Sequence, residues 1–478
     1  MSNLSDLLPA GAGAKSATFT ASGTLSSGQA VALQSDGTVS AITGTSQSIG
    51  SEVVFETTQT GETKCIFDSN SNKIVIAYRD EGNSNYGTAV VGTVSGTSIS
   101  FGTPVVFESA YITNLGAAFD SNSNKTVFAY RDNGNSNYGT AIVGTVSGTS
   151  ISFGSAVVYN TANTLNNPVV FDSNSNKIVI SYRDVGNSSY GTSIVGTVSG
   201  TSISFGTSTV FESATTLWLS ATFDSNSNKV VVAYQDNTNS SNGTAVVGTV
   251  SGTSISFGTP VVFNANTTTQ TTIAFDSTAN KVVTGYSDNG SPDTLKAIVG
   301  DVSGTSITFG TAVALGIDNP NTPSVVFDSN ANKVVISTRD GGNSNYGTLV
   351  PGTVSGTSIS FESSVVFNAG TTSFVSSVYD SNAAKVVTAY QDSNFISGTA
   401  IVFQNASTNS ADFIGITDQA IANTATGSVV VEGGVTEKLS GLTTGSTYYV
   451  QDDGSLSTTS SSVTAGKALS ATKLLLKG

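Results

Sequence analysis

Phe67–Lys73 reads Phe-Asp-Ser-Asn-Ser-Asn-Lys, and this heptapeptide returns along the chain at a fixed interval of 52 residues. Identical copies begin at Phe119, Phe171 and Phe223, and variants begin at Phe275, Phe327 and Tyr379. No insertion or deletion separates the seven copies. The heptapeptide therefore marks seven structural units, and repeats of this length are typical of solenoids, propellers and arrays.

Each unit is expected to contain four β-strands. In the first unit, one strand ends at the Phe-Asp of the anchor, and the others cover Lys73–Arg79, Gly87–Ser95 and Thr97–Phe107. The segment Thr-Ser-Ile-Ser-Phe alternates polar and apolar residues, which indicates a strand with one buried face. Four strands in a unit of this size are typical of a propeller blade.

The two ends of the repeat region predict a closed ring. The seventh unit stops after Ile401–Phe403 and lacks its fourth strand, while Thr43–Phe55 matches Ser95–Phe107 in register. The N-terminal segment is therefore expected to complete the last blade and to remove two exposed sheet edges. We predict an all-β chain with a seven-bladed β-propeller over residues 43–403, inserted into a small β-domain formed by residues 1–42 and 404–478.

The composition excludes several classes of function. Only 10% of the residues are charged, against about 25% in ordinary domains. A net charge of −14 with 18 Lys and Arg argues against a nucleic-acid partner. No apolar run is long enough to span a bilayer, and we expect no signal peptide because the N-terminus lacks a basic region followed by an apolar stretch. The chain has no His, and its lone Cys65 is expected in the core.

Two segments of each unit are rich in oxygen ligands. Asp68–Asn72 resembles the start of a calcium loop, but Lys73 follows where such a loop continues with Gly, so an Asx turn is predicted there. Asp80–Tyr86 lacks the lysine, and calcium binding stays open as an alternative to a simple turn. We predict no cofactor and no metal site.

The connections between blades differ strongly in composition, whereas the rest of the unit hardly changes. Compare Glu108–Gly116 with Glu212–Ser220. Loops on a rigid scaffold tend to carry binding residues, and large aromatic side chains are favoured anchors. The candidate ligand-binding residues in these connections are Tyr111, Ile112, Leu217, Trp218 and Phe374. The alternative is that they pack over the ends of the blades.

Four arginines occupy one position of the repeat, each followed by Asp: Arg79, Arg131, Arg183 and Arg339. They could converge near the mouth of the ring and bind a carboxylate, for which a guanidinium is well suited. The alternative is a structural pair copied with each blade. A glycosidase needs two carboxylates in distinct environments, and the nine Glu show no such asymmetric pair. We predict no enzyme activity and no catalytic residues.

The terminal segments carry a resemblance to a known family. It rests on Gly28–Leu33 with Asp36–Thr38, Phe413–Ile416, and Gly445–Val450 with Asp453–Leu456. These motifs resemble the small β-domains of phage tail-fibre and capsid-associated proteins, which implies a role in attachment or oligomerisation. The anchor heptapeptide is similar to the Asp-Ser-x-Gly-Asn turn of lectins and sialidase-like proteins, but Ser or Ala replaces the Gly.

These observations together predict a viral structural protein on the surface of the virion, synthesised in the host cytoplasm. Its propeller is expected to bind a host cell-surface glycan or protein. The terminal β-domain is expected to contact other virion proteins and to support a homo-oligomer. One alternative is a capsid-decorating or filament-forming protein without a specific ligand. A second is a sialidase-like enzyme that acts on glycans.

Overall fold

The computed structural model describes residues 15–290, 293–393 and 396–477. It divides into two compact units, one of residues 48–405 and one that combines the residues up to 47 with those from 406 onward. Residues 1–14 of the predicted N-terminal part, 1–42, lie outside the described residues. The division falls at 47/48 and 405/406, compared with the predicted 42/43 and 403/404.

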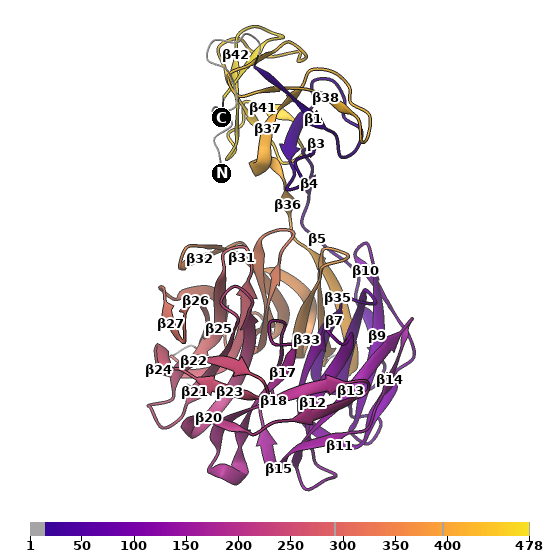
Figure 1. The fold of residues 1–478 in the computed structure, drawn as a ribbon, viewed down its shortest axis with the longest axis vertical. Coiled ribbons are helices and arrows are strands. Elements are labelled where there is room, and N and C mark those ends of the chain that lie inside the picture. The colour runs from indigo at the N-terminus through magenta and orange to yellow at the C-terminus, as the bar shows by residue number, and fades with distance from the viewer. Residues whose placement is uncertain (1–14, 291–292, 394–395, 478) are drawn as a thin grey trace. The chain divides into compact units, whose positions relative to one another are not determined.

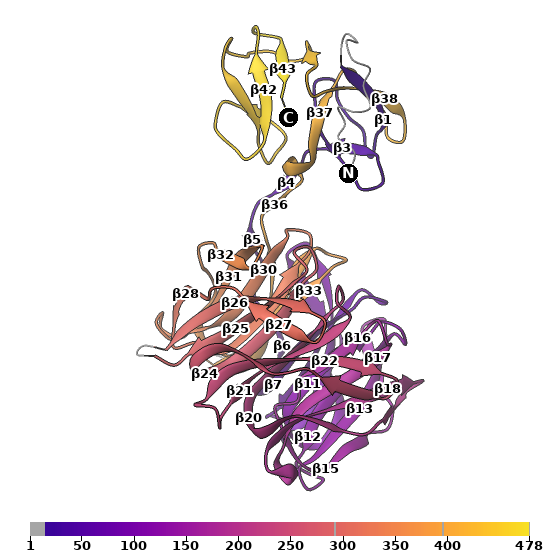
Figure 2. The ribbon, with the colours of Figure 1, turned by 60° about the vertical axis from the view of Figure 1, so that its left-hand side comes forward.

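The first unit is a seven-bladed β-propeller, as the repeat predicts (Figure 1). Each blade is an antiparallel sheet, and strands β20, β21 and β22 of one blade are visible in Figure 2. We number the blades 1 to 7 in the order of their Phe-Asp anchors.

Every blade contains the same second and third strands, which are hydrogen-bonded neighbours. The second strands are β8 (Lys73–Asp80), β12 (Lys125–Asp132), β17 (Lys177–Asp184), β21 (Lys229–Asp236), β25 (Lys281–Asp288), β30 (Lys333–Asp340) and β34 (Lys385–Asp392). The third strands are β9 (Tyr86–Ser95), β13 (Tyr138–Ser147), β18 (Tyr190–Ser199), β22 (Asn242–Ser251), β26 (Thr294–Ser303), β31 (Tyr346–Ser355) and β35 (Ser397–Gln404). The short outer strands are β10 (Ser98–Phe101), β14 (Ser150–Phe153), β19 (Ser202–Phe205), β23 (Ser254–Phe257), β27 (Ser306–Phe309) and β32 (Ser358–Phe361).

The connections between blades are strands, whereas the sequence predicted loops. Each runs from the outer edge of one blade into the innermost strand of the next. Four are continuous: β11 (Val105–Asp120), β20 (Thr209–Asp224), β24 (Val261–Asp276) and β33 (Val365–Asp380). Three are interrupted: β6 (Val53–Glu56) with β7 (Thr60–Asp68), β15 (Val157–Leu165) with β16 (Val169–Asp172), and β28 (Val313–Asp318) with β29 (Asn321–Asp328). Their residues pair with a second strand on one side and a third strand on the other, and this pairing holds even polar segments extended.

The anchor heptapeptide forms an Asx turn in every blade. In blade 1 the Asp68 carboxylate accepts hydrogen bonds from the backbone N–H groups of Asn70 (2.9 Å) and Ser71 (3.0 Å). The turn ends at Asn72, whose φ of 53° lies in the left-handed region that Asn tolerates better than most residues. All seven anchor aspartates make the same two bonds.

The N-terminal segment completes blade 7, as predicted. Strands β5 (Ser48–Ile49) and β6 pair with β35, so that Phe403 lies opposite Ile49 and Thr399 opposite Val54. These pairs are equivalent to Gly92–Phe101 and Thr88–Val106 of blade 1. The last blade thus gains its outer strand from the start of the propeller, and Figure 1 shows β5 beside β35.

The hydrophobic core is divided among seven clusters, each shared by two neighbouring blades. One of them joins blade 7 to blade 1 and contains Phe55, Cys65 and Val387. The ring of Phe55 lies 5.2 Å from that of Tyr78, and the same aromatic pair recurs in most blades. Cys65 is buried as predicted, and burial raises the pKa of its thiol to about 12.

The two faces of the propeller differ. We call the ends that carry the Asx turns and the turns before the short outer strands the hairpin face, and the opposite ends the connection face. The connection face carries the turns between second and third strands and the crossings from blade to blade. The chain enters and leaves the propeller at the hairpin face, where the Asn405 amide donates to the Asp328 carboxylate at 2.6 Å.

The small unit contains two five-stranded sheets and one two-stranded sheet. The first sheet has the order β1 (Ser16–Thr20), β38 (Thr426–Val431), β37 (Phe413–Thr417), β2 (Ala30–Leu33) and β3 (Val39–Ala41). The second has the order β39 (Val435–Thr436), β43 (Leu474–Leu476), β42 (Thr464–Ala468), β40 (Thr447–Val450) and β41 (Leu456–Ser457). The third pairs β36 (Ser407–Thr408) with β4 (Gly44–Thr45). Both termini therefore contribute to one unit.

Among the residues that the structure describes, helical structure is limited to two short 3-10 turns, η2 (Val185–Asn187) and η3 (Ser410–Asp412). Over the described ranges, the structure contains no helix with the length and apolarity to cross a membrane.

The closing strand provides a test of the ring. Phe55→Ala should lower the free energy of unfolding by about 3–5 kcal/mol, because it removes a buried ring from the cluster between blades 7 and 1. Val54→Ala is the matched control, since Val54 is 50% exposed on the same strand and should change stability by no more than about 0.5 kcal/mol. Urea unfolding followed by tyrosine fluorescence measures both. Equal effects would contradict closure by this strand.

Candidate ligand-binding site

The innermost strand of each blade is interrupted by a bulge close to the connection face. In blade 1 the pairing with β8 shifts between Gly61 and Lys64, and five other blades shift at equivalent positions. In blade 3 the strand breaks at this point, between β15 and β16. The first bulge residue has a φ between 49° and 55° in all seven blades. These residues, which we call the bulge ring, are Glu62, Asn114, Asn166, Trp218, Gln270, Thr322 and Phe374.

The bulge ring combines one backbone conformation with six residue types. Asn adopts the left-handed region readily, whereas other L-residues pay about 1–2 kcal/mol for it. A β-branched Thr or a bulky Trp or Phe is unusual at such a position. Since the scaffold would be served best by Asn or Gly, the side chains of Trp218 and Phe374 need another explanation.

Three members of the bulge ring connect neighbouring blades. The Asn114 side-chain oxygen accepts from the N–H of Asn166 at 2.9 Å. The Gln270 side-chain oxygen accepts from the N–H of Thr322 at 2.5 Å, and the Thr322 hydroxyl accepts from the N–H of Val375 at 3.1 Å. These bonds give Asn114, Gln270 and Thr322 a structural role.

The aromatic members make a different contribution. Trp218, in blade 4, is 42% exposed, while Phe374, in blade 7, is partly buried. Tyr111 lies on the crossing from blade 1 to blade 2, is 43% exposed, and has the Arg79 guanidinium 5.4 Å from its ring centroid. Tyr111 pairs with Tyr86 at the start of β9, so it belongs to the connection face, as Trp218 does. Two exposed aromatic side chains thus lie on the face that varies most between blades.

Two of the predicted ligand residues are less accessible. Ile112 is fully buried in the core between blades 1 and 2, so the prediction that it contacts a ligand is wrong. The strand alternates its side chains, and the exposure of Tyr111 therefore turns Ile112 inward. Leu217 is half-buried and pairs with Gln235 of β21.

The four arginines are held by local contacts. The Arg79 guanidinium contacts the Glu81 carboxylate at 2.5 Å and that of Glu62 at 3.8 Å. Arg131 donates from Nε to the Asn133 side chain at 3.1 Å. The Nε atoms of Arg183 and Arg339 are buried without a hydrogen-bond partner among the described residues, and burial lowers the pKa of both guanidinium groups. Across the described ranges, no acceptor is shared by arginines of different blades, which favours the structural alternative.

A channel of about 290 Å³ runs between the innermost strands, and all seven blades line it. Bulge-ring residues Glu62, Asn114 and Asn166 line it at the connection face. The sequence did not point to this channel, because its lining residues are mostly small and lie inside strands. Its only charged lining residues among those described are Glu62 and Lys64.

Pairs of carboxylates recur at the connection face of three blades. Burial and the Asp132 charge raise the pKa of Glu108, while a 2.9 Å hydrogen bond from the Tyr130 hydroxyl acts in the opposite direction. Glu212 has the same surroundings in blade 4, and in blade 1 burial and Glu56 raise the pKa of Asp80. The repetition identifies this arrangement as part of the blade.

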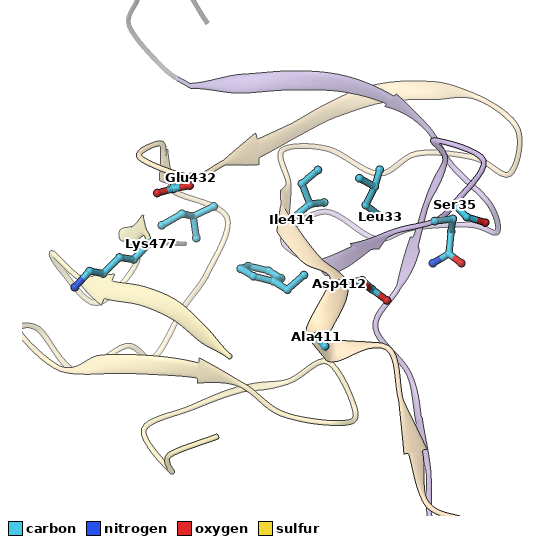
Figure 3. Close-up of a pocket in the computed structure, with 10 residues that line it drawn as sticks. Leu33, Ser35, Ala411, Asp412, Ile414, Glu432 and Lys477 are labelled. Atoms are coloured by element: carbon cyan, nitrogen blue, oxygen red, sulfur yellow. The ribbon is translucent and has the colours of Figure 1, made fainter. Parts of the chain in front are cut away.

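The small unit has a cavity of its own, of about 700 Å³. Leu33 and Ile414 lie on one side of it and Lys477 on the other, with Asp412 and Glu432 also at its edge (Figure 3). Its lining is mixed, and Leu33 is 38% exposed. Among the described residues, no group of three or more His, Cys, Asp or Glu is arranged to hold a metal ion.

Comparison with known proteins identifies the fold and no family. No family model and no curated protein matches the chain. A lectin from Burkholderia pseudomallei, BP39L, is similar in structure with a TM-score of 0.54 at 9% identity, covering 74% of this chain and 98% of the lectin. A protein of unknown function from Dyadobacter fermentans has a TM-score of 0.47 at 12% identity, covering 75% of this chain and 99% of its own. The first similarity supports the propeller fold alone.

The carboxylate pairs predict how stability depends on pH. The folded pKa of Glu108 lies above its ordinary value of 4.5, so folding favours the protonated form. Its contribution to the free energy of unfolding is fully present below pH 4.5 and is lost as pH rises through the folded pKa. Glu108→Gln should therefore make the decline with pH less steep. Tyr130→Phe should make it steeper, because it removes the hydrogen bond that stabilises the carboxylate. Urea unfolding between pH 4 and pH 8 measures the slopes, and parallel slopes for the two variants would refute the assignment.

The bulge-ring conformation predicts a difference between two substitutions at one position. Trp218→Asn and Trp218→Ala both remove the indole, but Asn tolerates a φ of 52° and Ala does not. The Asn variant should be more stable than the Ala variant by about 1 kcal/mol in urea unfolding. The same pair at Tyr111, where φ is not positive, is the control and should show no advantage for Asn. An Asn advantage at Tyr111 alone would contradict the bulge geometry.

Proposed function

We propose that the propeller is a non-enzymatic recognition module that binds a host-surface glycan at the connection face, around the mouth of its channel. The observation that carries the proposal is Trp218, an exposed indole kept in an unfavourable backbone conformation on the bulge ring. Strained residues of this kind cluster at ligand-binding sites. All seven blades share this backbone conformation, but only blade 4 places an exposed aromatic side chain on it, and a ligand contact explains that choice of residue.

The chemistry of the rim suits a sugar. A pyranose offers an apolar C–H face and an edge of hydroxyl groups, so it needs a flat apolar surface beside neutral hydrogen-bonding groups. The rings of Trp218 and Phe374 supply the flat apolar surface, and the side-chain amide of Asn166 supplies a neutral hydrogen-bonding group. BP39L, which shares the fold, is described as a lectin.

A glycan-active enzyme is the weaker alternative. Glycoside hydrolysis requires one acid and one base or nucleophile in different environments. The carboxylate pairs of this propeller recur in three blades with the same tyrosine partner, and two of the arginines are engaged by their own blade. Because the same arrangement recurs around the ring, it provides no unique pair of carboxylates in different environments that could act as acid and base.

We further propose that the protein is a virion appendage, with the small unit as its attachment to other virion proteins or to further copies of the chain. The support is the resemblance of the terminal motifs, together with exposed apolar side chains at Leu33, Val435 and Leu475. Such side chains on a small unit are suited to a protein contact. A capsid-decorating or filament-forming role without a ligand is the competing proposal.

Binding to whole candidate host cells and to a glycan array tests recognition. Trp218→Asn should weaken binding by about tenfold or more, since a central aromatic anchor contributes about 2 kcal/mol or more. Tyr111→Ala should weaken it less. The control is Val262→Ala, because Val262 is as exposed as Trp218 (42%) but lies near the start of β24, where this strand pairs with β22 at the outer edge of a blade. If the wild-type protein binds no cell and no glycan, the decorating role replaces this proposal.

A further inference from the structure

A second ring of equivalent residues lies two positions after the bulge ring, inside the channel. Its members are Lys64, Gly116, Pro168, Ser220, Thr272, Ser324 and Ser376, and all seven line the channel. Four consecutive blades, 5, 6, 7 and 1, contribute Thr272, Ser324, Ser376 and Lys64. The opposite arc, in blades 2 and 3, contributes Gly116 and Pro168, which have no polar side chain.

The hydroxyl groups of the first arc are oriented by bonds between blades. Thr272 Oγ1 accepts from the N–H of Val325 at 3.0 Å, Ser324 Oγ from Ser377 at 2.9 Å, and Ser376 Oγ from Cys65 at 3.0 Å. Each bond uses a lone pair of the oxygen and leaves its own O–H proton available. Within the described part of the chain, no acceptor takes these protons. The arc is therefore rich in hydrogen-bond donors.

Lys64 adds a positive charge at the end of this arc. No carboxylate of the described residues lies within 4.0 Å of its ammonium group. Glu62 stands nearer the mouth and approaches Arg79 at 3.8 Å. Lys64 is exposed in the channel, where the surrounding protein lowers the pKa of its ammonium group through desolvation and the Glu62 charge partly offsets this effect. Lys64 is a solvent-exposed cation of the channel without an ion-pair partner among the described residues, and an anion placed beside it can form a charge-assisted hydrogen bond with it.

We infer that the channel receives a carboxylate of the bound ligand, held by Lys64 and by the hydroxyl groups of Thr272, Ser324 and Ser376. The ligand class is then an acidic glycan, with a uronate-type residue entering the channel and its neighbours contacting the aromatic rim. The channel volume of about 290 Å³ suits one such residue rather than a longer chain. The glycan class rests on the proposed function, but the carboxylate site can be tested without it.

The direct test uses small probes and the intact protein. Lysines are converted to their ¹³C-dimethyl form and followed by NMR, and Lys64→Met identifies the Lys64 signal. Glucuronate should shift this signal in a saturable manner and glucose should not. Glu62→Gln should strengthen glucuronate binding several-fold, because it removes a negative charge near the site. No shift with glucuronate, or an equal shift with glucose, overturns the inference.

A glycan array separates this inference from the proposed function. Acidic glycans and their carboxyl-reduced forms are compared on one array. Reduction should weaken wild-type binding by about tenfold or more, as expected for a charge-assisted hydrogen bond, and Lys64→Met should bind both forms equally. Binding that depends on Trp218 but ignores the carboxylate would retain the recognition role and refute the carboxylate site. Absence of all glycan binding together with a glucuronate shift at Lys64 would retain the site and refute the glycan role.

Discussion

The structure depends on the burial of both faces of every blade. A blade is a single sheet with apolar residues on each side, and each hydrophobic cluster is completed by the next blade around the ring. An open array would leave one apolar face exposed at each end, together with unpaired strand edges. Pairing of β5 and β6 with β35 solves both problems, since it supplies the missing outer strand and brings Phe55 into the final cluster. The ring is therefore a cooperative whole, although its units are repeated.

Closure fixes the backbone and leaves few positions free to differ. The anchor aspartate recurs because it holds the Asx turn, and the buried tyrosine of the second strand and its phenylalanine neighbour recur because they maintain contact between blades. Residues that face the channel or its mouth make no contact that recurs in every blade. They can therefore differ between blades while the ring still forms. These positions are the bulge ring and the second ring, two residues further along each strand, that includes Lys64 and Ser376. Their diversity is concentrated where a ligand on the axis would be reached.

Much of the fold could be predicted from the sequence, because the anchor spacing, the alternation in Thr97–Phe101 and the match of Thr43–Phe55 all report local pairing. The site could be predicted only in part. Residue type alone indicates Trp218 and Tyr111 as candidates. It does not predict the left-handed backbone at position 218, because Asn or Gly is the usual residue at such a position. The polar Thr, Asn and Ser residues of the crossings show no alternation, so the sequence predicts loops there and does not reveal that Ile112 points inward. Hydrogen bonds between residues 52 or 53 apart, such as Ser377 to Ser324, exist only once neighbouring blades have packed together.

A ring of seven similar blades would be expected to offer seven similar sites, as in multivalent recognition. The distribution of side chains argues for one site on the axis instead. In the ring of channel residues that contains Lys64, donor side chains occupy blades 5, 6, 7 and 1, whereas blades 2 and 3 contribute Gly116 and Pro168. The large aromatic members of the bulge ring occur in blades 4 and 7 alone. Divergence of single residues in a repeated scaffold has thus broken its symmetry at the axis, while the clefts between blades remain filled by their shared cores. An asymmetric ligand that lies on the axis can bind a single asymmetric site in one orientation. Seven equivalent sites around a symmetric ring would bind it in seven equivalent orientations.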